Sequence, residues 1–208
     1  MTRAEAVIFD IGNVLIEWQP EHYYDARIGP DRRRALFAAV DLHGMNARVD
    51  DGAPFRQTIY DTADRHPEWA TEIRWWHDHW IDLASPRIDH SIHLLRRLRA
   101  RGVPVFALTN FGHDSFAYAQ TQYDFLTEFD RAFVSGQLRI SKPEPAIYAH
   151  VERESGLSPA ALLFTDDRAE NIAAAATRGW PTHLFDGPQP WADCLVAHGL
   201  LTPKEARP

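Results

Sequence analysis

Three stretches of the chain are apolar throughout and do not alternate between apolar and polar positions. They are residues 6–9, 103–108 and 162–164. Runs of this kind are typical of strands in a parallel sheet that is covered on both faces. Two weaker runs, residues 131–134 and 182–185, have a similar composition. The pattern therefore predicts five short strands.

Helix-like stretches separate these apolar runs. Residues 89–100, 146–155 and 171–178 show helical spacing or an alanine-rich composition, and a glycine follows each of them within two residues. A glycine just past the last periodic residue is a common end signal for a helix. Strands that alternate with helices indicate βαβ units. We therefore predict an α/β protein with a doubly wound parallel sheet.

The stretch of residues 16–86 interrupts this alternation. Three pieces within it have helical spacing, namely residues 32–40, 54–63 and 68–83. The stretch is rich in aromatic residues and contains no clear strand pattern. We interpret it as a helical cap that is inserted after the first strand and lies over the strand ends. Residues 1–15 and 87–208 then form the α/β core.

The composition excludes several classes of protein. The chain has 208 residues, of which 45% are hydrophobic and 25% charged, as in ordinary globular proteins. Cys194 is the only cysteine, which excludes an intrachain disulfide and a cysteine-based zinc site. The formal net charge of −7 does not favour nucleic-acid binding. Without an apolar run long enough for a membrane span or a signal peptide, we expect a cytoplasmic protein.

Polar residues follow three of the predicted strands. They are Asp10, Thr109, Asn110, Asp166 and Asp167. In doubly wound sheets, ligands bind beyond the carboxyl ends of the strands. Adjacent buried carboxylates repel each other unless a cation joins them, and Mg²⁺ is the hard cation that suits oxygen ligands. The alternative is that Asp166 caps the following helix and Asp167 is solvated.

Lys142 is one of two lysines in a chain that otherwise uses arginine for positive charge. It lies between Ile140 and two prolines, so that its backbone is stiff, and its ammonium is a compact partner for phosphate oxygens. Three carboxylates are balanced by Mg²⁺ and Lys142, so a phosphate dianion can approach. Asp10 could then attack phosphorus in line and form an aspartyl-phosphate.

Four segments together resemble the motifs of the haloacid dehalogenase-like hydrolase superfamily, in the same order. They are residues 9–15, 108–110, 141–145 and 164–171. The resemblance covers nearly the whole chain and implies a Rossmann-like core with a cap of the C1 type. The first motif, Asp-X-Gly-Asn-Val, is similar to that of the subgroup containing α-D-glucose-1-phosphatase and the phosphatase domain of bifunctional epoxide hydrolases.

The resemblance implies a Mg²⁺-dependent phosphatase that acts on a small-molecule phosphate ester, with sugar phosphates preferred by analogy. Asp10 would be the nucleophile and a metal ligand, Gly12 would offer its backbone carbonyl to the metal, and Asp166 and Asp167 would complete the metal site. Thr109, Asn110 and Lys142 would bind phosphate. The oligomeric state stays open.

Gly12 departs from the commonest family pattern, which has an acid/base aspartate two residues after the nucleophile. Glycine cannot transfer a proton, so we expect a preference for aryl or anomeric phosphates, whose leaving groups need little protonation. Two alternatives stay open, a 2-haloacid dehalogenase and a non-catalytic module that binds a phospho-ligand or a protein. His22, His43 and Met45 lie in the cap stretch without an assigned role.

Overall fold

The computed structural model describes residues 4–208, which contain one parallel sheet of five strands in the order β5–β4–β1–β6–β7. The strands are β1 (Ala6–Phe9), β4 (Val105–Thr109), β5 (Arg131–Val134), β6 (Leu162–Asp166) and β7 (Thr182–Leu184). This confirms the doubly wound α/β fold. The strand predicted from residue 103 begins two residues later, because Pro104 has no N–H to donate to the sheet.

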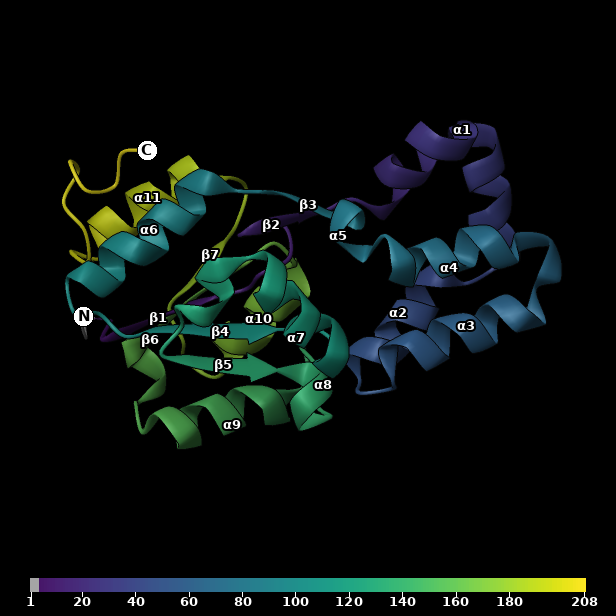
Figure 1. Ribbon diagram of the computed structural model, residues 1–208. Helices are drawn as coiled ribbons and strands as arrows, with labels where there is room; N and C mark the ends of the chain where they lie inside the picture. Colours follow the sequence, from purple (N-terminus) through teal and green to yellow (C-terminus); the bar gives the residue numbers. More distant parts are fainter. Residues whose placement is uncertain (1–3) are drawn as a thin grey trace.

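Helices cover both faces of the sheet (Figure 1). On one face lie α6 (Asp89–Ala100) and α11 (Pro188–Ala197), and on the other α9 (Pro145–Ser155) and α10 (Ala169–Thr177). Successive residues of a strand point to opposite faces. Val7 and Phe9 accordingly belong to the first hydrophobic cluster, while Ala6 and Ile8 belong to the second.

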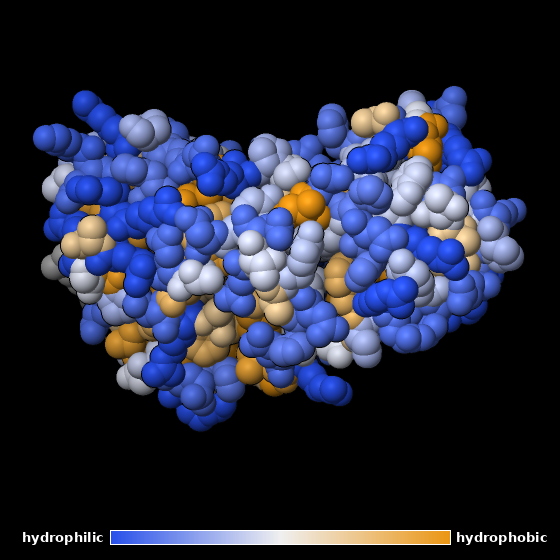
Figure 2. Space-filling model, in the orientation of Figure 1, coloured by the Kyte–Doolittle hydropathy of each residue, from blue (hydrophilic) through white to orange (hydrophobic). Residues whose placement is uncertain are grey.

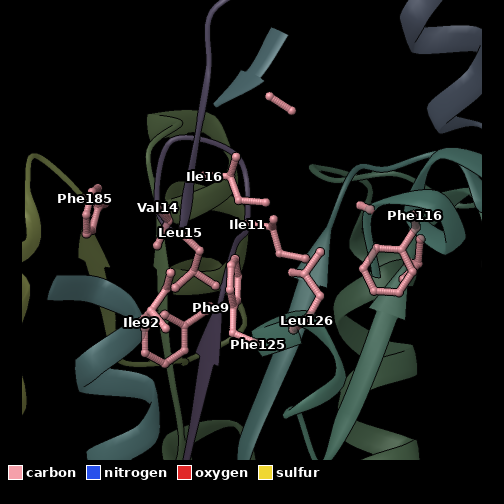
Figure 3. Packing of buried hydrophobic residues seen from close by; sticks show 14 of the residues in the cluster. Phe9, Ile11, Val14, Leu15, Ile16, Ile92, Phe116, Phe125, Leu126 and Phe185 are labelled. Atoms are coloured by element: carbon pink, nitrogen blue, oxygen red, sulfur yellow. The ribbon is translucent and has the colours of Figure 1, made fainter. Parts of the chain in front are cut away.

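The first cluster continues past the end of β1 into the turn that carries the site. Ile11, Val14 and Leu15 are fully buried there and pack with Phe9 above α6 (Figure 3). Burial of these side chains holds the chain immediately after Asp10 in place. Aliphatic side chains contribute about 1.5–3 kcal/mol each when they are fully buried.

Two helices of the core were not predicted from the pattern, α7 (His113–Gln122) and α11. Short connecting helices complete this part, namely η2 (Asp124–Thr127), α8 (Ser135–Leu138) and η3 (Pro159–Ala161). In α7 the buried residues are Ser115, Phe116 and Ala119. Only one of these is a large apolar residue, so the helix shows little hydrophobic periodicity.

Five helices form the cap stretch, beside the sheet in Figure 1. They are α1 (Pro20–Ala39), α2 (Leu42–Asp50), α3 (Phe55–Arg65), α4 (Ala70–Asp78) and α5 (Trp80–Leu83), with the turn η1 (Pro67–Trp69) before α4. α1 is broken where Gly29 has a φ of 77° and Pro30 follows. Tyr24 and Trp76 are fully buried at the centre of this layer, so the aromatic residues form its core.

The expectation that residues 16–86 contain no strand was wrong. β2 (Ile16–Trp18) and β3 (Ala84–Arg87) pair antiparallel, at the points where the chain enters and leaves the helical layer. Each strand has only three or four residues, and β3 includes Pro86, so neither shows a recognisable alternation. The ladder ties the two connections together and sets the base of the cap.

The face of the molecule in Figure 2 is mainly hydrophilic, with hydrophobic residues in small separate groups. Among residues 4–208, no helix combines the length and the apolar character that a membrane span requires.

Candidate active site

Asp10 lies directly beyond β1, the central strand of the sheet. Its Oδ1 accepts a hydrogen bond from the backbone N–H of Ile11 at 2.7 Å and lies 2.9 Å from Nζ of Lys142. Asp10 is 7% exposed and Lys142 is 4% exposed. The nucleophile predicted from the sequence therefore lies next to the predicted phosphate ligand, in a largely buried position.

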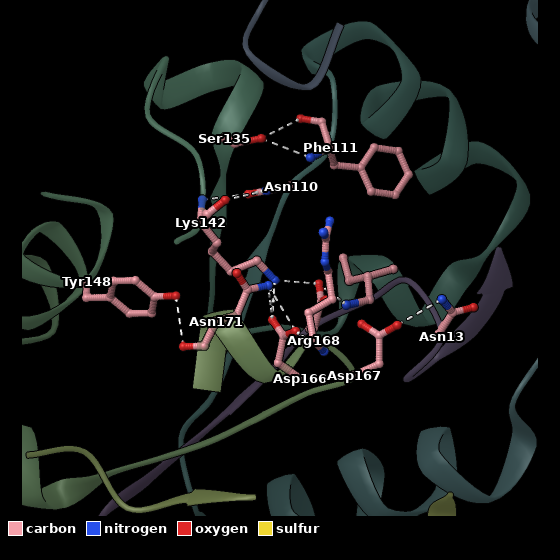
Figure 4. A network of polar contacts seen from close by, with 12 residues as sticks. Asn13, Asn110, Phe111, Ser135, Lys142, Tyr148, Asp166, Asp167, Arg168 and Asn171 are labelled. Atoms are coloured by element: carbon pink, nitrogen blue, oxygen red, sulfur yellow. Dashed lines mark hydrogen bonds and ion pairs between the residues drawn. The ribbon is translucent and has the colours of Figure 1, made fainter. Parts of the chain in front are cut away.

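Asp166 is the last residue of β6, which pairs directly with β1. It is fully buried, and its oxygens accept hydrogen bonds from three sources. Lys142 Nζ lies 2.6 Å away, the Arg168 backbone N–H 2.8 Å away and Asn171 Nδ2 3.0 Å away (Figure 4). Because Lys142 reaches both Asp10 and Asp166, its ammonium bridges the ends of two neighbouring strands.

Asp167 is half-buried and lines the cavity above the sheet. It accepts a hydrogen bond of 2.9 Å from Asn13 Nδ2, and Asn13 Oδ1 in turn accepts from the Trp18 backbone N–H. Asn13 has a φ of 56°, a left-handed conformation that asparagine tolerates better than most residues. Its side chain thus connects the turn after β1, the turn after β6 and the base of the cap.

The three carboxylates are close enough to share a cation. Oxygen atoms of Asp10, Asp166 and Asp167 lie within 4.8 Å of one another. Burial raises the pKa of Asp10 to about 7, with Lys142 opposing that shift and the two other carboxylates adding to it. Burial also raises the pKa of Asp167. A divalent cation would relieve this repulsion, and the oxygen donors fit Mg²⁺.

The predicted phosphate ligands of the second motif differ in their positions. Of the described residues, those that line the cavity include Asn110 but not Thr109, which is buried at the end of β4. Asn110 donates to the carbonyl of Lys142 at 2.9 Å and accepts from its N–H at 2.8 Å. The Asn110 side chain is therefore used to position Lys142, a role that the sequence did not indicate.

Gly12 lines the cavity between Asp10 and Asn13, and it forms a backbone bridge with Ile16 at the start of β2. A Cβ atom built on Gly12 would have no other atom within 4 Å, apart from those of its chain neighbours. The position is thus open to solvent or substrate on the side toward which a side chain at residue 12 would project.

A cavity of about 610 Å³ opens above these residues, between the core and the helical layer. Trp18, Trp80 and Phe111 form an aromatic wall along it. Their rings are in contact, with centroids 6.2 Å apart for Trp18 and Trp80 and 5.4 Å apart for Trp80 and Phe111. The cavity thus combines a charged floor with one wall suited to an apolar group.

The cap helix α2 supplies a second, polar wall. His43, Asn46, Ala47 and Asp50 line the cavity, and their spacing of three and four residues places them on one face of the helix. Met45 points the other way and is fully buried. Of the three cap residues noted in the sequence, only His43 reaches the cavity lining among the described residues.

Sequence reasoning missed Asn13, Asn171 and Asp50 as parts of the site. Asn13 and Asn171 lie within the first and the fourth motif. Their places in the sequence, close to Asp10 and Asp167, were the signal that could have identified them. Asp50 follows no strand and has no motif, and nothing in the sequence marks it.

Comparisons with known proteins agree with this architecture. Residues 4–179 match the family described as haloacid dehalogenase-like hydrolase. The sesquiterpene phosphatase astK of Aspergillus oryzae is 27% identical over 96% of this chain and 98% of its own length. An (S)-2-haloacid dehalogenase of Pseudomonas fluorescens is 30% identical over 42% of this chain and 38% of its own.

Among solved structures, a mutant form of the HAD family enzyme BT-2542 of Bacteroides thetaiotaomicron, in complex with magnesium and inorganic phosphate, has a similar fold. The TM-score is 0.70 at 19% identity, over 88% of this chain and 95% of that one.

Proposed function

The chain belongs to the haloacid dehalogenase-like hydrolases, and from this premise we propose that it is a Mg²⁺-dependent phosphomonoesterase with Asp10 as its nucleophile. The acidic cluster on the cavity floor carries the proposal. Asp10, Asp166 and Asp167 contribute three negative charges, and Lys142 contributes one positive charge. The remaining two negative charges match one divalent cation.

The proposed reaction has two steps. The Asp10 carboxylate attacks phosphorus, so that an O–P bond forms and the bond to the ester oxygen breaks. Water then attacks phosphorus and releases inorganic phosphate from Asp10. Lys142 neutralises charge on the transferring group throughout. A bound Mg²⁺ would supply Lewis-acid stabilisation of the phosphate oxygens. Its proposed ligands are Asp10, the Gly12 carbonyl, Asp166 and Asp167.

For the substrate we propose a small phosphate ester with an apolar or ring-shaped organic group. The aromatic wall of Trp18, Trp80 and Phe111 favours such a group, because aromatic rings bury a large apolar area. The name of the relative astK, a sesquiterpene phosphatase, points in the same direction. The motif of residues 10–14 supports instead the subgroup that contains α-D-glucose-1-phosphatase, so sugar phosphates form the comparison set.

A phosphate-release assay tests this function directly. The protein is incubated with Mg²⁺ or with excess EDTA and a panel of p-nitrophenyl, isoprenoid, alkyl and sugar phosphates. We expect turnover that EDTA abolishes and that the Asp10→Asn variant lacks. No turnover of any ester by the wild-type protein, with thermal stability intact, would contradict the proposal and would favour a phospho-ligand binding role.

A 2-haloacid dehalogenase is the second candidate, since two such enzymes match part of the chain. Resemblance to the superfamily implies that dehalogenation needs no metal. It also implies that the fourth motif of a 2-haloacid dehalogenase has no adjacent acidic pair. Asp166 and Asp167 therefore favour the phosphatase. Chloride release from (S)-2-chloropropionate in the presence of EDTA would reverse this preference.

A further inference from the structure

The proposed phosphatase reaction lacks a proton donor among the residues of the first motif. When the ester bond breaks, an alkoxide leaving group needs a proton, and Gly12 has no side chain to supply one. A replacement has to lie on the cavity, close to the substrate-binding loops, and must carry a proton near neutral pH.

Asp50 meets the requirement of position. It lies at the C-terminal end of α2 and lines the same cavity as Asp10, Gly12 and Lys142. Its Oδ2 accepts a hydrogen bond of 2.8 Å from Asn46 Nδ2, one turn earlier on the same face of the helix. The carboxyl is therefore held in place by a hydrogen bond on the face of α2 that lines the cavity.

Contacts with the core hold this end of α2 above the site. The Ser135 hydroxyl donates to the Asp50 carbonyl at 2.6 Å and accepts from the Phe111 N–H at 2.9 Å. Gly112 packs so closely that a Cβ there would lie 2.5 Å from Val49 Cγ1. Although Asp50 belongs to the cap, these contacts join it to the loops after β4 and β5.

We propose that Asp50 protonates the leaving-group oxygen in the first step and takes a proton from the attacking water in the second. The inference rests on the proposed phosphatase function and assigns its missing acid and base. Proton transfer then requires no side chain at position 12.

The proton balance closes over one turnover. As the Asp10 oxygen bonds to phosphorus, the P–O ester bond breaks and the Asp50 O–H proton passes to the departing oxygen. Asp50 is then a carboxylate. In the second step, the water oxygen bonds to phosphorus, the bond between phosphorus and Asp10 breaks, and the water proton passes to Asp50.

The charges around Asp50 are consistent with this role. Burial raises its pKa well above the ordinary value, and the neighbouring Asp51 and the more distant Asp10 add to the shift, against hydrogen bonds from Gly112 and Asn46. Among residues 4–208, Glu17 and Asp167 are further carboxylates on the same cavity, and Lys142 and Arg168 are its lysine and arginine. A raised pKa keeps the carboxyl protonated further toward neutral pH.

His43 is the other titratable residue on this face of α2, but its position fits the role less well. It lies two turns from Asp50, its side chain is 57% exposed and its Nε2 is 2.9 Å from Glu21 Oε1. It is thus largely exposed to solvent and already paired with a carboxylate.

The Asp50→Asn variant tests the proposal with two esters of similar size, p-nitrophenyl phosphate and 2-phenylethyl phosphate. p-Nitrophenolate can leave without being protonated, whereas the alkoxide leaving group of 2-phenylethyl phosphate needs a proton. In single-turnover experiments we expect the variant to transfer phosphate from the alkyl ester about 10²–10⁴-fold more slowly than the wild type. With the aryl ester we expect a rapid burst of one equivalent, followed by slow hydrolysis of the aspartyl-phosphate.

The pH profile gives a readout that a structural role would not change. In the wild type, kcat/KM for the alkyl ester should fall at high pH as Asp50 loses its proton, and this limb should be absent in Asp50→Asn. The control is Asp31→Asn, which removes the same charge from α1 of the cap, where the side chain is 94% exposed, and should leave the rates with both esters unchanged. Melting temperatures of all variants check the fold.

The outcomes separate this inference from the proposed function. If wild-type protein hydrolyses the aryl ester in an Asp10-dependent reaction, the phosphatase function stands. Asp50 is then overturned as the acid if wild type does not hydrolyse the alkyl ester, or if Asp50→Asn slows transfer from both esters equally. If the wild type hydrolyses only the aryl ester, the preference for activated leaving groups expected from Gly12 is a property of the wild-type enzyme.

Discussion

Gly12 combines an absent side chain with free space around it. Apart from its chain neighbours, no residue has an atom within 4 Å of a Cβ added there, and its φ is not in the left-handed region that disfavours other residues. The backbone conformation and the space at Cβ therefore permit a residue with a side chain at this position. The position is a place where proton transfer can be added experimentally.

Gly12→Asp should rescue the Asp50→Asn variant. A carboxyl two residues after Asp10 would lie on the same cavity and could replace the lost acid. We expect the single-turnover rate with 2-phenylethyl phosphate to rise about tenfold or more over Asp50→Asn alone, within the range for one acid/base group. Gly12→Asn is the matched control, because it has the same size and no transferable proton; an equal gain from it would contradict the explanation.

At the scale of elements, the C-terminal segment of residues 198–208 is held against α6 by polar contacts. Glu205 Oε2 accepts hydrogen bonds from the Thr202 N–H at 2.8 Å and from Arg101 at 2.8 Å. His93 Nε2 lies 3.1 Å from the Glu205 carbonyl oxygen. Hydrogen bonds to the carboxylate from the Thr202 hydroxyl, the Thr202 N–H and Arg101 lower the pKa of Glu205 to about 2.

Glu205→Gln should destabilise the protein at neutral pH but not in acid. Because the folded-state pKa is below the ordinary 4.5, the ionised carboxylate stabilises the fold above that pH. The contribution is lost as the pH falls from 4.5 toward 2. Urea unfolding at several pH values measures the difference between the two proteins, which should be modest because the carboxylate lies at the surface and is partly accessible to water.

The control for this prediction is Glu68→Gln, in the exposed turn η1. It removes one surface carboxylate from the cap without touching the C-terminal segment. A wild-type advantage over Glu205→Gln that stayed constant down to pH 2 would contradict the assigned hydrogen bonds.

At the scale of the whole molecule, the cavity exists because the cap and the core meet closely at one end of α2. Gly112 permits this approach, since a Cβ at that position would lie 2.5 Å from Val49 Cγ1 and 3.1 Å from the Val49 carbonyl oxygen. Val49 is itself buried. The relative position of Asp50 and Asp10 thus depends on a glycine that no motif contains.

Gly112→Ala should push α2 away from the core. We expect a loss of about 1–3 kcal/mol in the free energy of unfolding, as for other overpacked sites. In a Val49→Ala background the loss should be smaller by about 0.5 kcal/mol or more, because one clashing atom is gone. Chemical denaturation of the wild type, the two single variants and the double variant completes this double-mutant cycle. Strictly additive losses in the free energy of unfolding would contradict a direct clash with Val49.

Gly12→Ala is the matched control for stability in this cycle. The added methyl group has the same size and meets no atom within 4 Å apart from those of its chain neighbours. Only its free energy of unfolding is compared, and we expect it to stay close to that of the wild type. A loss as large as that of Gly112→Ala would show that crowding against Val49 is not the cause.

The sequence by itself determined the sheet and the floor of the site. Buried parallel strands are apolar throughout, so β1, β4 and β6 were recognisable from local composition. Their carboxyl ends necessarily meet at one edge, which placed Asp10 near Asp166 and Asp167. These inferences succeeded because each depends on a few consecutive residues and on one rule of topology.

Only the tertiary structure decided what surrounds that floor. The pairing of β2 with β3, the aromatic wall and the position of Asp50 depend on contacts between residues far apart in the chain. The hydrogen bonds of Asn110 to Lys142 likewise join two separate loops. Side-chain packing between the cap and the core produces no hydrophobic periodicity in the sequence of either segment, because these contacts depend on the shapes of both parts together.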